Sequence, residues 1–402
     1  MNNLIKAKYL FKHRNELVSD KEYEPLSVTQ HGIVPRLSNV ALSKVDDNRK
    51  KVCKDDIVLN SRSARRGSSG VSMYDGCVSG VNHVIFSDKI LPKFSHYFIK
   101  SKHFMDQYYI HGKGIHDDIW GTRIDELLSI KIPFYKKEKQ IEIIKNIENF
   151  ENAIQKKINI SLDKMKLLKL FLKSKTNEIL FGKNSSLGFK ENTLEIDLEK
   201  KFSSWTKIRL NFLGNFYKGR GLDKSKLKDS GMPCILYGEI YSKYNIKFNK
   251  ASSFTDKENE KNCELVYKND ILLTASGETS EEIGKAIAYM GNEPILAGGD
   301  VIIFRIKEEN KINPIFLSYF LNSLYGIFQK EVYAKGYITF HIYEAQLQNL
   351  VVFYPTIKEQ NKIVKQLNFY YETINSIIEK ETSKLKIYDE VMKNQISKYF
   401  QN

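Results

Sequence analysis

Three arginines lie close together in the segment NSRSARRGSSG (60–70). A guanidinium group offers paired donors that fit phosphate oxygens or the O6 and N7 acceptors of guanine. The interleaved serines and Gly67 would let the backbone approach a ligand closely. We therefore interpret this segment as a contact for nucleic acid, the alternative being a mobile charged loop. The residues assigned to it are Arg62, Arg65, Arg66, Ser61, Ser63 and Ser68.

A second group of cations and aromatic residues lies in the other half of the chain. Lys218, Arg220 and Lys224 surround a glycine-flanked turn, and Tyr237, Tyr241 and Lys243 add aromatic and cationic surface. The loop Thr274–Lys285 corresponds in order to the arginine segment, and Thr274 and Ser276 are assigned to the site with it. It is acidic, with Glu278, Glu281 and Glu282, which disfavours a phosphate contact but leaves open a glutamate that accepts from a cytosine amino group. The alternative for the aromatic residues is ordinary core packing.

The overall charge also favours a polyanionic partner. The formal net charge is +15 at pH 7, although a lysine-rich surface that only maintains solubility would give the same value. Hydrophobic content of 42% and charged content of 28% are ordinary for a globular protein. Because no apolar run approaches the roughly 18 residues of a membrane span, we expect a cytoplasmic protein without membrane contact. Four widely spaced cysteines indicate reduced, incidental thiols.

Motifs for catalysis were sought and not found. The chain has no Pro-Pro pair for an adenine methyltransferase loop, and GETSEEIGKA (277–286) lacks the spacing of a phosphate loop. No nucleophile–base pair or metal-ligand pattern stands out. The sequence therefore predicts no catalytic residues, no bound metal and no cofactor.

The elements that would position these residues occur twice. FYKKEKQIEIIKNI (134–147) recurs as FYPTIKEQNKIVKQL (353–367), which places Gln140 opposite Gln360 at an offset of about 220 residues. Near-heptad apolar stripes continue from both copies through windows free of glycine and proline, as in a coiled coil. We predict an antiparallel pairing of the two helices, the alternative being that each packs only on its own domain.

These features define an α+β architecture with a pseudo-two-fold internal repeat. Two globular mixed α/β domains are separated by two long helices that form an antiparallel coiled coil. Strands are expected at 55–60, 80–86, 269–274 and 299–304, and single helices at 91–108 and 312–329. The predicted segments are a first domain at 1–133, a first long helix at 134–182, a linker at 183–204, a second domain at 205–354 and a second long helix at 355–402.

The order of these segments resembles the DNA-specificity subunits of Type I restriction–modification systems. The second helix entry has the family's proline, Glu-Gln pair and following isoleucine at Pro355, Glu359, Gln360 and Ile363. The first entry keeps Pro133 and Gln140, but Lys139 replaces the glutamate. WTKIRLNFLGNFYKGRG (205–221) is also similar to family sequences.

The resemblance implies a non-catalytic subunit with two target-recognition domains, each reading one half of a bipartite double-stranded DNA target. The helices would set the gap and dock two methyltransferase subunits, and the holoenzyme would add two restriction/translocase subunits. The residues assigned to the helices and docking are Gln140, Ile144, Glu359, Gln360 and Ile363. The alternative is a self-contained DNA methyltransferase or nuclease with an unrecognised active site.

Overall fold

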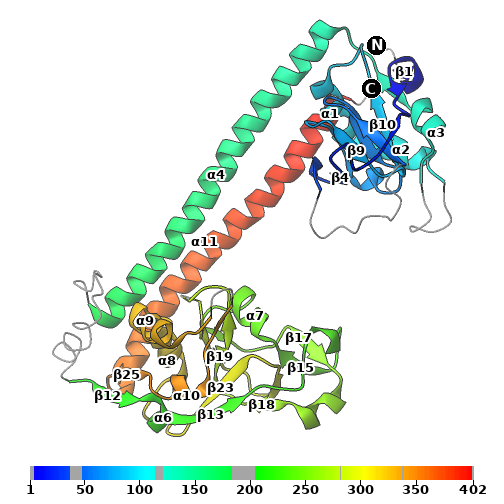
Figure 1. The fold of residues 1–402 in the computed structure, drawn as a ribbon. Coiled ribbons are helices and arrows are strands. Elements are labelled where there is room, and N and C mark those ends of the chain that lie inside the picture. The colour runs from blue at the N-terminus through cyan, green and yellow to red at the C-terminus, as the bar shows by residue number, and fades with distance from the viewer. Residues whose placement is uncertain are drawn as a thin grey trace. The chain divides into compact units, whose positions relative to one another are not determined.

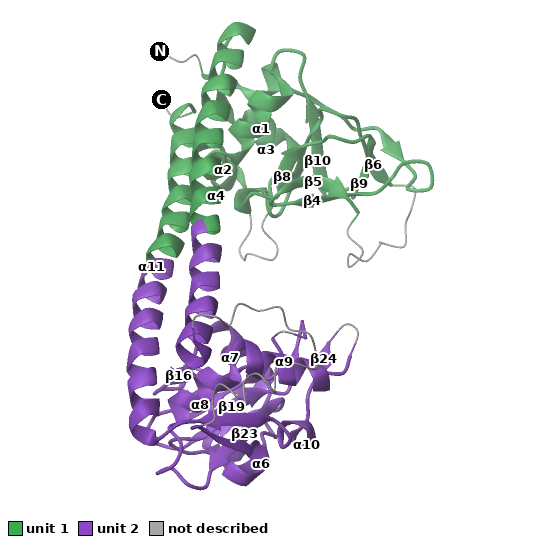
Figure 2. Cartoon of the chain, turned by 90° about the vertical axis from the view of Figure 1, so that its left-hand side faces the viewer, with its two compact units in different colours: residues 1–163, 380–402 green, residues 164–379 purple. Residues whose placement is uncertain are grey.

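The protein is described from a computed structural model, in which residues 4–36, 48–113, 121–182, 204–280, 282–336 and 339–400 are placed well enough to describe. The predicted linker at 183–204 lies almost entirely outside these residues. The chain folds as two compact units, unit 1 with residues 1–163 and 380–402 and unit 2 with residues 164–379 (Figure 2). Each unit therefore holds part of both long helices.

The long helices are α4 (Lys137–Phe181, 45 residues) and α11 (Ile357–Lys398, 42 residues), drawn side by side in Figure 1. In unit 1 the Ser161 hydroxyl donates to Glu381 Oε2 (3.0 Å), and in unit 2 the Thr176 hydroxyl lies 3.3 Å from that of Tyr371. Residue numbers rise along one helix as they fall along the other, so the pairing is antiparallel, as predicted. Ser161 and Glu381 are 220 residues apart, which is also the repeat offset, so equivalent positions face each other here.

Unit 1 contains short, mostly antiparallel strands. Its largest sheet has the order β2-β10-β7-β8, beside a three-stranded sheet β3-β6-β9, a hairpin β4-β5 and the pair β1-β11. The expected strands at 55–60 and 80–86 are found as β7 and β10. The bounds are β1 Leu4–Lys6, β2 Lys12–His13, β3 Leu17–Val18, β4 Leu26–Thr29, β5 Gly32–Pro35, β6 Arg49–Val52, β7 Ile57–Asn60, β8 Ser69–Val71, β9 Gly76–Val78, β10 Asn82–Phe86 and β11 Lys131–Pro133.

The helices of unit 1 join these sheets to the long helices. They are η1 (Ala7–Tyr9), η2 (Ala64–Arg66), α1 (Pro92–Lys100), α2 (Lys102–His111) and α3 (Ile124–Ser129). One hydrophobic core contains Phe94 and Phe98 of α1, Ile143 and Ile147 of α4, and Phe400, which follows α11. The beginning of α4 and the segment after α11 are thus anchored in this unit by apolar burial.

Unit 2 repeats this plan with larger sheets. Two five-stranded sheets have the orders β13-β23-β19-β21-β16 and β14-β17-β15-β22-β18, and β12-β25 and β20-β24 form separate pairs. The expected strands at 269–274 and 299–304 are found as β19 and β23. The bounds are β12 Thr206–Arg209, β13 Gly214–Lys218, β14 Leu227–Lys228, β15 Met232–Ile235, β16 Lys247–Phe248, β17 Ser253–Thr255, β18 Glu264–Val266, β19 Ile271–Thr274, β20 Ser276–Gly277, β21 Ala286–Tyr289, β22 Ile295–Ala297, β23 Val301–Ile306, β24 Phe340–His341 and β25 Val351–Tyr354.

The helices of unit 2 are α6 (Leu210–Leu213), η3 (Lys224–Lys226), α7 (Tyr237–Ser242), η4 (Lys257–Asn262), α8 (Pro314–Leu321), α9 (Leu324–Tyr333) and α10 (Glu344–Leu347). The core packs Phe316 and Phe320 of α8 against Ile363 and Leu367 of α11 and Phe181 of α4. Unit 1 has the same arrangement with the two long helices exchanged. There the beginning of α4 packs against α1 together with the residue that follows α11, whereas here the beginning of α11 packs against α8 together with the end of α4.

The expectation of a single helix at 91–108 and at 312–329 is wrong in both units. The first is broken at Ser101, whose hydroxyl accepts from Phe104 N (3.2 Å), and the second at Ser323, whose hydroxyl accepts from Gly326 N (3.3 Å). Serine competes with the helix by capping a new N-terminus. Each new N-terminus also binds a long helix, because Lys102 N donates to Ser397 Oγ (2.9 Å) and Leu324 N to Asn177 Oδ1 (3.0 Å).

Candidate nucleic-acid interface

The arginine segment of unit 1 is a hydrogen-bonded turn that follows strand β7. Asn60 Oδ1 accepts from the backbone N–H groups of Arg62 (3.0 Å) and Ser63 (3.2 Å), which starts the turn. The short helix η2 then ends at Gly67, whose φ of 92° requires glycine. The Ser63 carbonyl closes the turn by accepting from Arg66 N (2.8 Å) and Ser68 N (3.2 Å). The backbone of the turn is therefore closed by its own hydrogen bonds.

Lys100 of α1 fastens this turn to the rest of unit 1. Its ammonium group donates to the carbonyl oxygens of Gly67 (2.6 Å) and Gln30 (2.7 Å), and burial lowers the pKa of Lys100 to about 8. Lys100 was not predicted as part of the site, because a single lysine at the end of an amphipathic helix has no sequence pattern that distinguishes it from a solvent-exposed lysine.

The assigned residues of this turn differ in accessibility. The side chains of Arg62 and Arg66 are exposed. The Arg65 guanidinium instead lies over the Tyr109 ring, 5.8 Å from its centroid, which adds an aromatic residue of α2 that the sequence analysis did not single out. Ser68 is buried and Ser61 and Ser63 are half-buried, so the serines shape the turn while two arginines extend from it.

In unit 2 the predicted turn after β13 also presents cations. Lys218, Arg220 and Lys224 are all exposed. A Cβ at Gly219 would lie 2.1 Å from the Gly298 carbonyl oxygen, and Gly221 has a φ of 75°, so the turn depends on both glycines. Arg220 approaches Glu264 only loosely, at 3.9 Å. The guanidinium therefore stays available to an anion.

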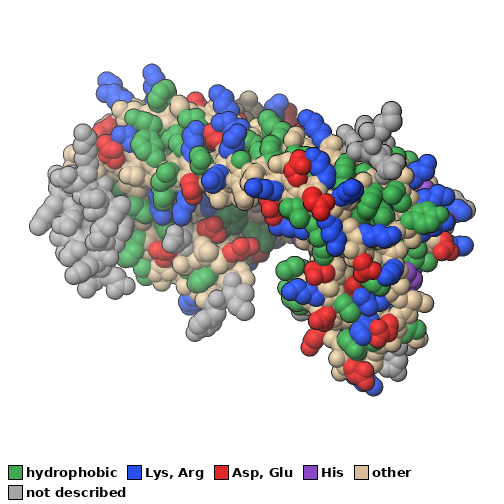
Figure 3. All heavy atoms as spheres, turned by 90° about the horizontal axis from the view of Figure 1, so that it is seen from above, with side chains coloured by type: hydrophobic (Ala, Val, Ile, Leu, Met, Phe, Trp, Pro, Cys, Tyr) green, Lys and Arg blue, Asp and Glu red, His purple; other side chains and the backbone are tan. Residues whose placement is uncertain are grey.

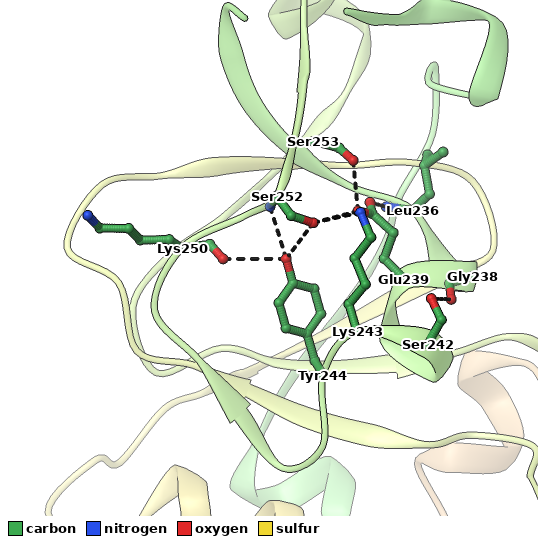
Figure 4. Close-up of polar contacts among 9 residues, drawn as sticks. All are labelled: Leu236, Gly238, Glu239, Ser242, Lys243, Tyr244, Lys250, Ser252 and Ser253. Carbon is green, nitrogen blue, oxygen red and sulfur yellow. Dashed lines mark hydrogen bonds and ion pairs between the residues drawn. The ribbon is translucent and has the colours of Figure 1, made fainter. Parts of the chain in front are cut away.

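Lys243 is held in the network drawn in Figure 4, centred on the buried Glu239 carboxylate of α7. Lys243 Nζ donates to Glu239 Oε1 (2.7 Å), which also accepts from the hydroxyls of Ser252 (2.9 Å) and Ser253 (2.7 Å). Burial alone would raise the pKa of Glu239, but the hydrogen bond from Lys243 and the others outweigh it and hold that pKa below its usual value. Much of the charge of Lys243 is therefore neutralised within the unit. Tyr237, which was assigned to the same surface, is exposed.

Thr274 and Ser276 are buried in unit 2, and the half-buried Tyr241 bonds to both of their segments. The Tyr241 hydroxyl lies 2.6 Å from Thr274 Oγ1 and 2.8 Å from the Ser276 carbonyl oxygen, and burial raises the pKa of Tyr241 to about 12. Thr274 is fully buried, and Ser276 Oγ lies 3.0 Å from His341 Nδ1. These three residues position the loop that follows β19. The burial of Thr274 and Ser276 corrects their assignment as direct contacts, and the assignment of Tyr241 stays a prediction.

The acidic loop itself is exposed at Glu278 and Glu282, while Glu281 lies outside the described residues. Two lysines absent from our sequence assignment hold its end. Lys285 Nζ donates to the Tyr244 carbonyl (2.6 Å), and the fully buried Lys330 donates to the Gly284 carbonyl (2.7 Å). Glu282 also lines a cleft of about 480 Å³ in unit 2 together with Lys169 and Lys173 of α4.

The two glutamines assigned to the helices are buried joints between each long helix and its domain. Gln140 Oε1 accepts from Leu91 N (2.8 Å), and its amide donates to the carbonyls of Lys89 and Tyr135. Gln360 repeats this pattern, because its Oε1 accepts from Asn313 N (2.8 Å) and its amide donates to the carbonyls of Lys311 and Pro355.

Among the other residues assigned to docking, Ile144 and Ile363 pack in the cores of units 1 and 2 respectively. Of the five, only Glu359 is exposed. A docking surface on the helices must therefore use other exposed positions as well.

The face of the molecule seen in Figure 3 carries many Lys and Arg side chains, interspersed with acidic and hydrophobic ones. Within the described residues, no group of three or more His, Cys, Asp or Glu side chains is arranged to hold a metal ion. The described helices include none that is long and apolar enough to span a membrane.

Comparison with known proteins agrees with this geometry. Residues 203–386 match the family described as Type I restriction modification DNA specificity domain. No curated protein matches the sequence. A solved chain from work on complex assembly and conformational transition of the type I R-M system has a TM-score of 0.64 at 12% identity, covering 98% of this chain and 96% of that chain.

Two further solved structures are less similar. The HsdS subunit from Thermoanaerobacter tengcongensis has a TM-score of 0.47 at 14% identity, covering 99% of this chain and 96% of that one. The S subunit of the Type-I restriction-modification system from M. genitalium has a TM-score of 0.41 at 16% identity, covering 100% of this chain and 96% of that one.

The chain thus combines two paired long helices with two β-rich units that carry exposed cationic turns. Residues 203–386 match the Type I restriction modification DNA specificity domain family, and the chain as a whole shares its fold with the solved chain at 12% identity.

Proposed function

We propose that the chain reads a bipartite duplex, with the domain at 1–133 contacting one half-site and the domain at 205–354 the other. The observation that carries this proposal is the duplicated joint at Gln140 and Gln360, where the same three types of hydrogen bond attach a β-rich domain to a long helix. A repeated module with two different sets of exposed cations is suited to two different half-sites.

In this proposal the paired helices set the gap between the half-sites and dock two methyltransferase subunits. The holoenzyme adds two restriction/translocase subunits, and the specificity chain itself is non-catalytic and cytoplasmic. The linker at 183–204 connects the first helix to the second domain. Half-sites about one helical turn of DNA apart, about 34 Å, would present their major grooves on one face of the duplex.

The two turns of exposed cations provide the test of one domain per half-site. Arg62→Ala with Arg66→Ala should relax the target only in one half, and Lys218→Ala with Arg220→Ala only in the other. The readout is genome-wide mapping of methylated adenines after co-expression with the cognate methyltransferase subunit. Arg209→Ala with Lys307→Ala removes two other exposed cations and serves as the matched control. Loss of sequence preference in both halves from either pair would contradict the proposal.

Binding measurements add an independent readout. Each lost phosphate contact should reduce the slope of log K against log salt by about 0.9. A lost base contact should instead weaken binding to the cognate sequence by about 1–3 kcal/mol and leave nonspecific binding in place.

The role of the helices in spacing is tested by an insertion. Four residues inserted into α4 near Met165 should change the preferred gap or abolish assembly, while the bases recognised in each half stay the same. An unchanged gap with full activity would count against a spacing role. Methylation of DNA by the purified chain with S-adenosylmethionine alone would favour the self-contained enzyme instead.

A further inference from the structure

The long helices carry a contiguous exposed apolar surface in unit 2, which we call the aromatic patch. It consists of Leu167, Leu170 and Phe171 on α4 with Phe369 and Tyr370 on α11. Leu167, Leu170, Phe171 and Phe369 are between 48% and 66% exposed. The Tyr370 ring connects the helices, because its centroid lies 6.3 Å from that of Phe171 and 5.7 Å from that of Phe369.

An exposed cluster of this kind is unusual on a water-facing coiled coil. Large apolar side chains gathered on one surface mark a site for another protein. Aromatic and leucine side chains at spacings of three and four residues form one helix face. The aromatic patch therefore has the form of a docking surface.

The internal repeat places an equivalent surface in unit 1, which we call the mixed patch. At the repeat offset, Leu167 corresponds to Ile387 and Phe171 to Val391, both of which are exposed (54% and 40%). Tyr370 corresponds to Phe150, which is also aromatic and half-buried. The remaining two positions differ in chemistry. Leu170 corresponds to Glu390 and Phe369 to Asn149, and both of these polar residues are exposed.

A surface duplicated at the repeat offset suits two copies of one partner, and this inference rests on the proposed docking of two methyltransferase subunits. We propose that these subunits bind with unequal affinity, the first on the aromatic patch and the second on the mixed patch. Aromatic residues such as Phe369 of the aromatic patch are enriched at the energetically important positions of protein interfaces. A carboxylate such as Glu390 of the mixed patch must instead be desolvated or paired on binding, which weakens the contact. Two such differences between the sites predict dissociation constants that differ by at least about tenfold.

The full-length chain titrated with purified methyltransferase subunit provides the test, with native mass spectrometry for stoichiometry and calorimetry for the two binding steps. A complex with one methyltransferase subunit should accumulate before the complex with two. Leu170→Glu with Phe369→Asn gives the aromatic patch the polar residues of the mixed patch. This variant should weaken the tighter step at least about tenfold and leave the weaker step unchanged.

The reverse exchange and a matched control complete the test. Glu390→Leu with Asn149→Phe should strengthen the weaker step until the two are similar. Leu162→Glu with Phe212→Asn changes two side chains of similar exposure (48% and 66%) outside both patches and should change neither step. Unaltered circular dichroism and thermal midpoints establish that each variant is folded.

The possible outcomes separate this inference from the proposed function. Two equal steps in the unmodified chain, or no effect of the Leu170→Glu and Phe369→Asn exchange, would overturn the inference while docking of two subunits stands. If no methyltransferase subunit binds the unmodified chain, both fail. If the exchange changes only self-association of the chain, the patch is a surface for a second copy and the inference is wrong.

Discussion

The Ser161–Glu381 hydrogen bond allows a sharp test of the coiled coil, because the repeat makes the two positions equivalent. Both side chains are 4% exposed, and Glu381 Oε1 also pairs with Lys384 Nζ (3.0 Å). Ser161→Glu would bring a second carboxylate against Glu381 and remove the hydroxyl donor. Two like charges in buried contact, with the hydroxyl donor lost, should lower the free energy of unfolding by about 3–5 kcal/mol, the cost of an uncompensated buried charge.

The exchange Ser161→Glu with Glu381→Ser should restore most of the lost stability. The residue equivalent to Lys384 is Lys164, so a lysine follows three residues after either position. We expect the exchanged chain to lie within about 1 kcal/mol of the unmodified one, which corresponds to a coupling of at least about 2 kcal/mol between the two sites.

Urea unfolding followed by circular dichroism, with hydrogen exchange of the α4 and α11 amides, provides the measurement. Asn159→Glu adds a carboxylate at an exposed position of the same helix and should change stability by no more than about 0.5 kcal/mol. An exchanged chain as unstable as Ser161→Glu alone would refute the equivalence of the two positions.

Three further outcomes follow from buried polar groups. Gln360→Leu leaves three backbone partners without their hydrogen bonds and should lower the free energy of unfolding by about 2–4 kcal/mol in urea unfolding, unlike a change at the exposed Glu359. Burial lowers the pKa of Lys330 to about 7 from 10.5, so between these values the unfolded chain binds the additional proton and this group makes stability rise with pH. Lys330→Met should remove that contribution, up to about 1.4 kcal/mol per pH unit, as seen by comparing urea midpoints of both chains across the window. Tyr241→Phe should loosen the loop after β19, raise hydrogen exchange of its amides and weaken recognition of one half-site, while the half-site read by the first domain is unaffected.

The repeat and the long helices could be predicted from the sequence because they depend on periodic burial. Apolar residues at heptad spacing and the absence of glycine and proline indicate α4 and α11 without any tertiary information. The break at Ser101 was not predictable by the same means, since the apolar pattern continues through it. It depends on a capping hydroxyl and on Ser397, almost 300 residues away in sequence.

The candidate site was predicted less well, because a polar side chain in a loop gives no sign of its direction. Arg62 and Arg66 are exposed, whereas the buried Thr274 bonds to the half-buried Tyr241 within unit 2. Lys100 and Lys330 were not predicted, because their role depends on tertiary contacts. Each satisfies backbone carbonyls from within a helix, and such a role depends only on the loop brought beside it by the fold.

The glutamine joints have a consequence for how new specificities arise. The side-chain hydrogen bonds of Gln140 and Gln360 described above go to main-chain amides and carbonyls, so this part of the attachment does not depend on which side chains the domain carries. The apolar packing beside it needs only hydrophobic residues at the same positions. A gene rearrangement with breakpoints near these codons could replace an entire domain and preserve its seating on the helix. The family could thereby acquire an unrelated half-target in one genetic event, without compensating mutations at the junction.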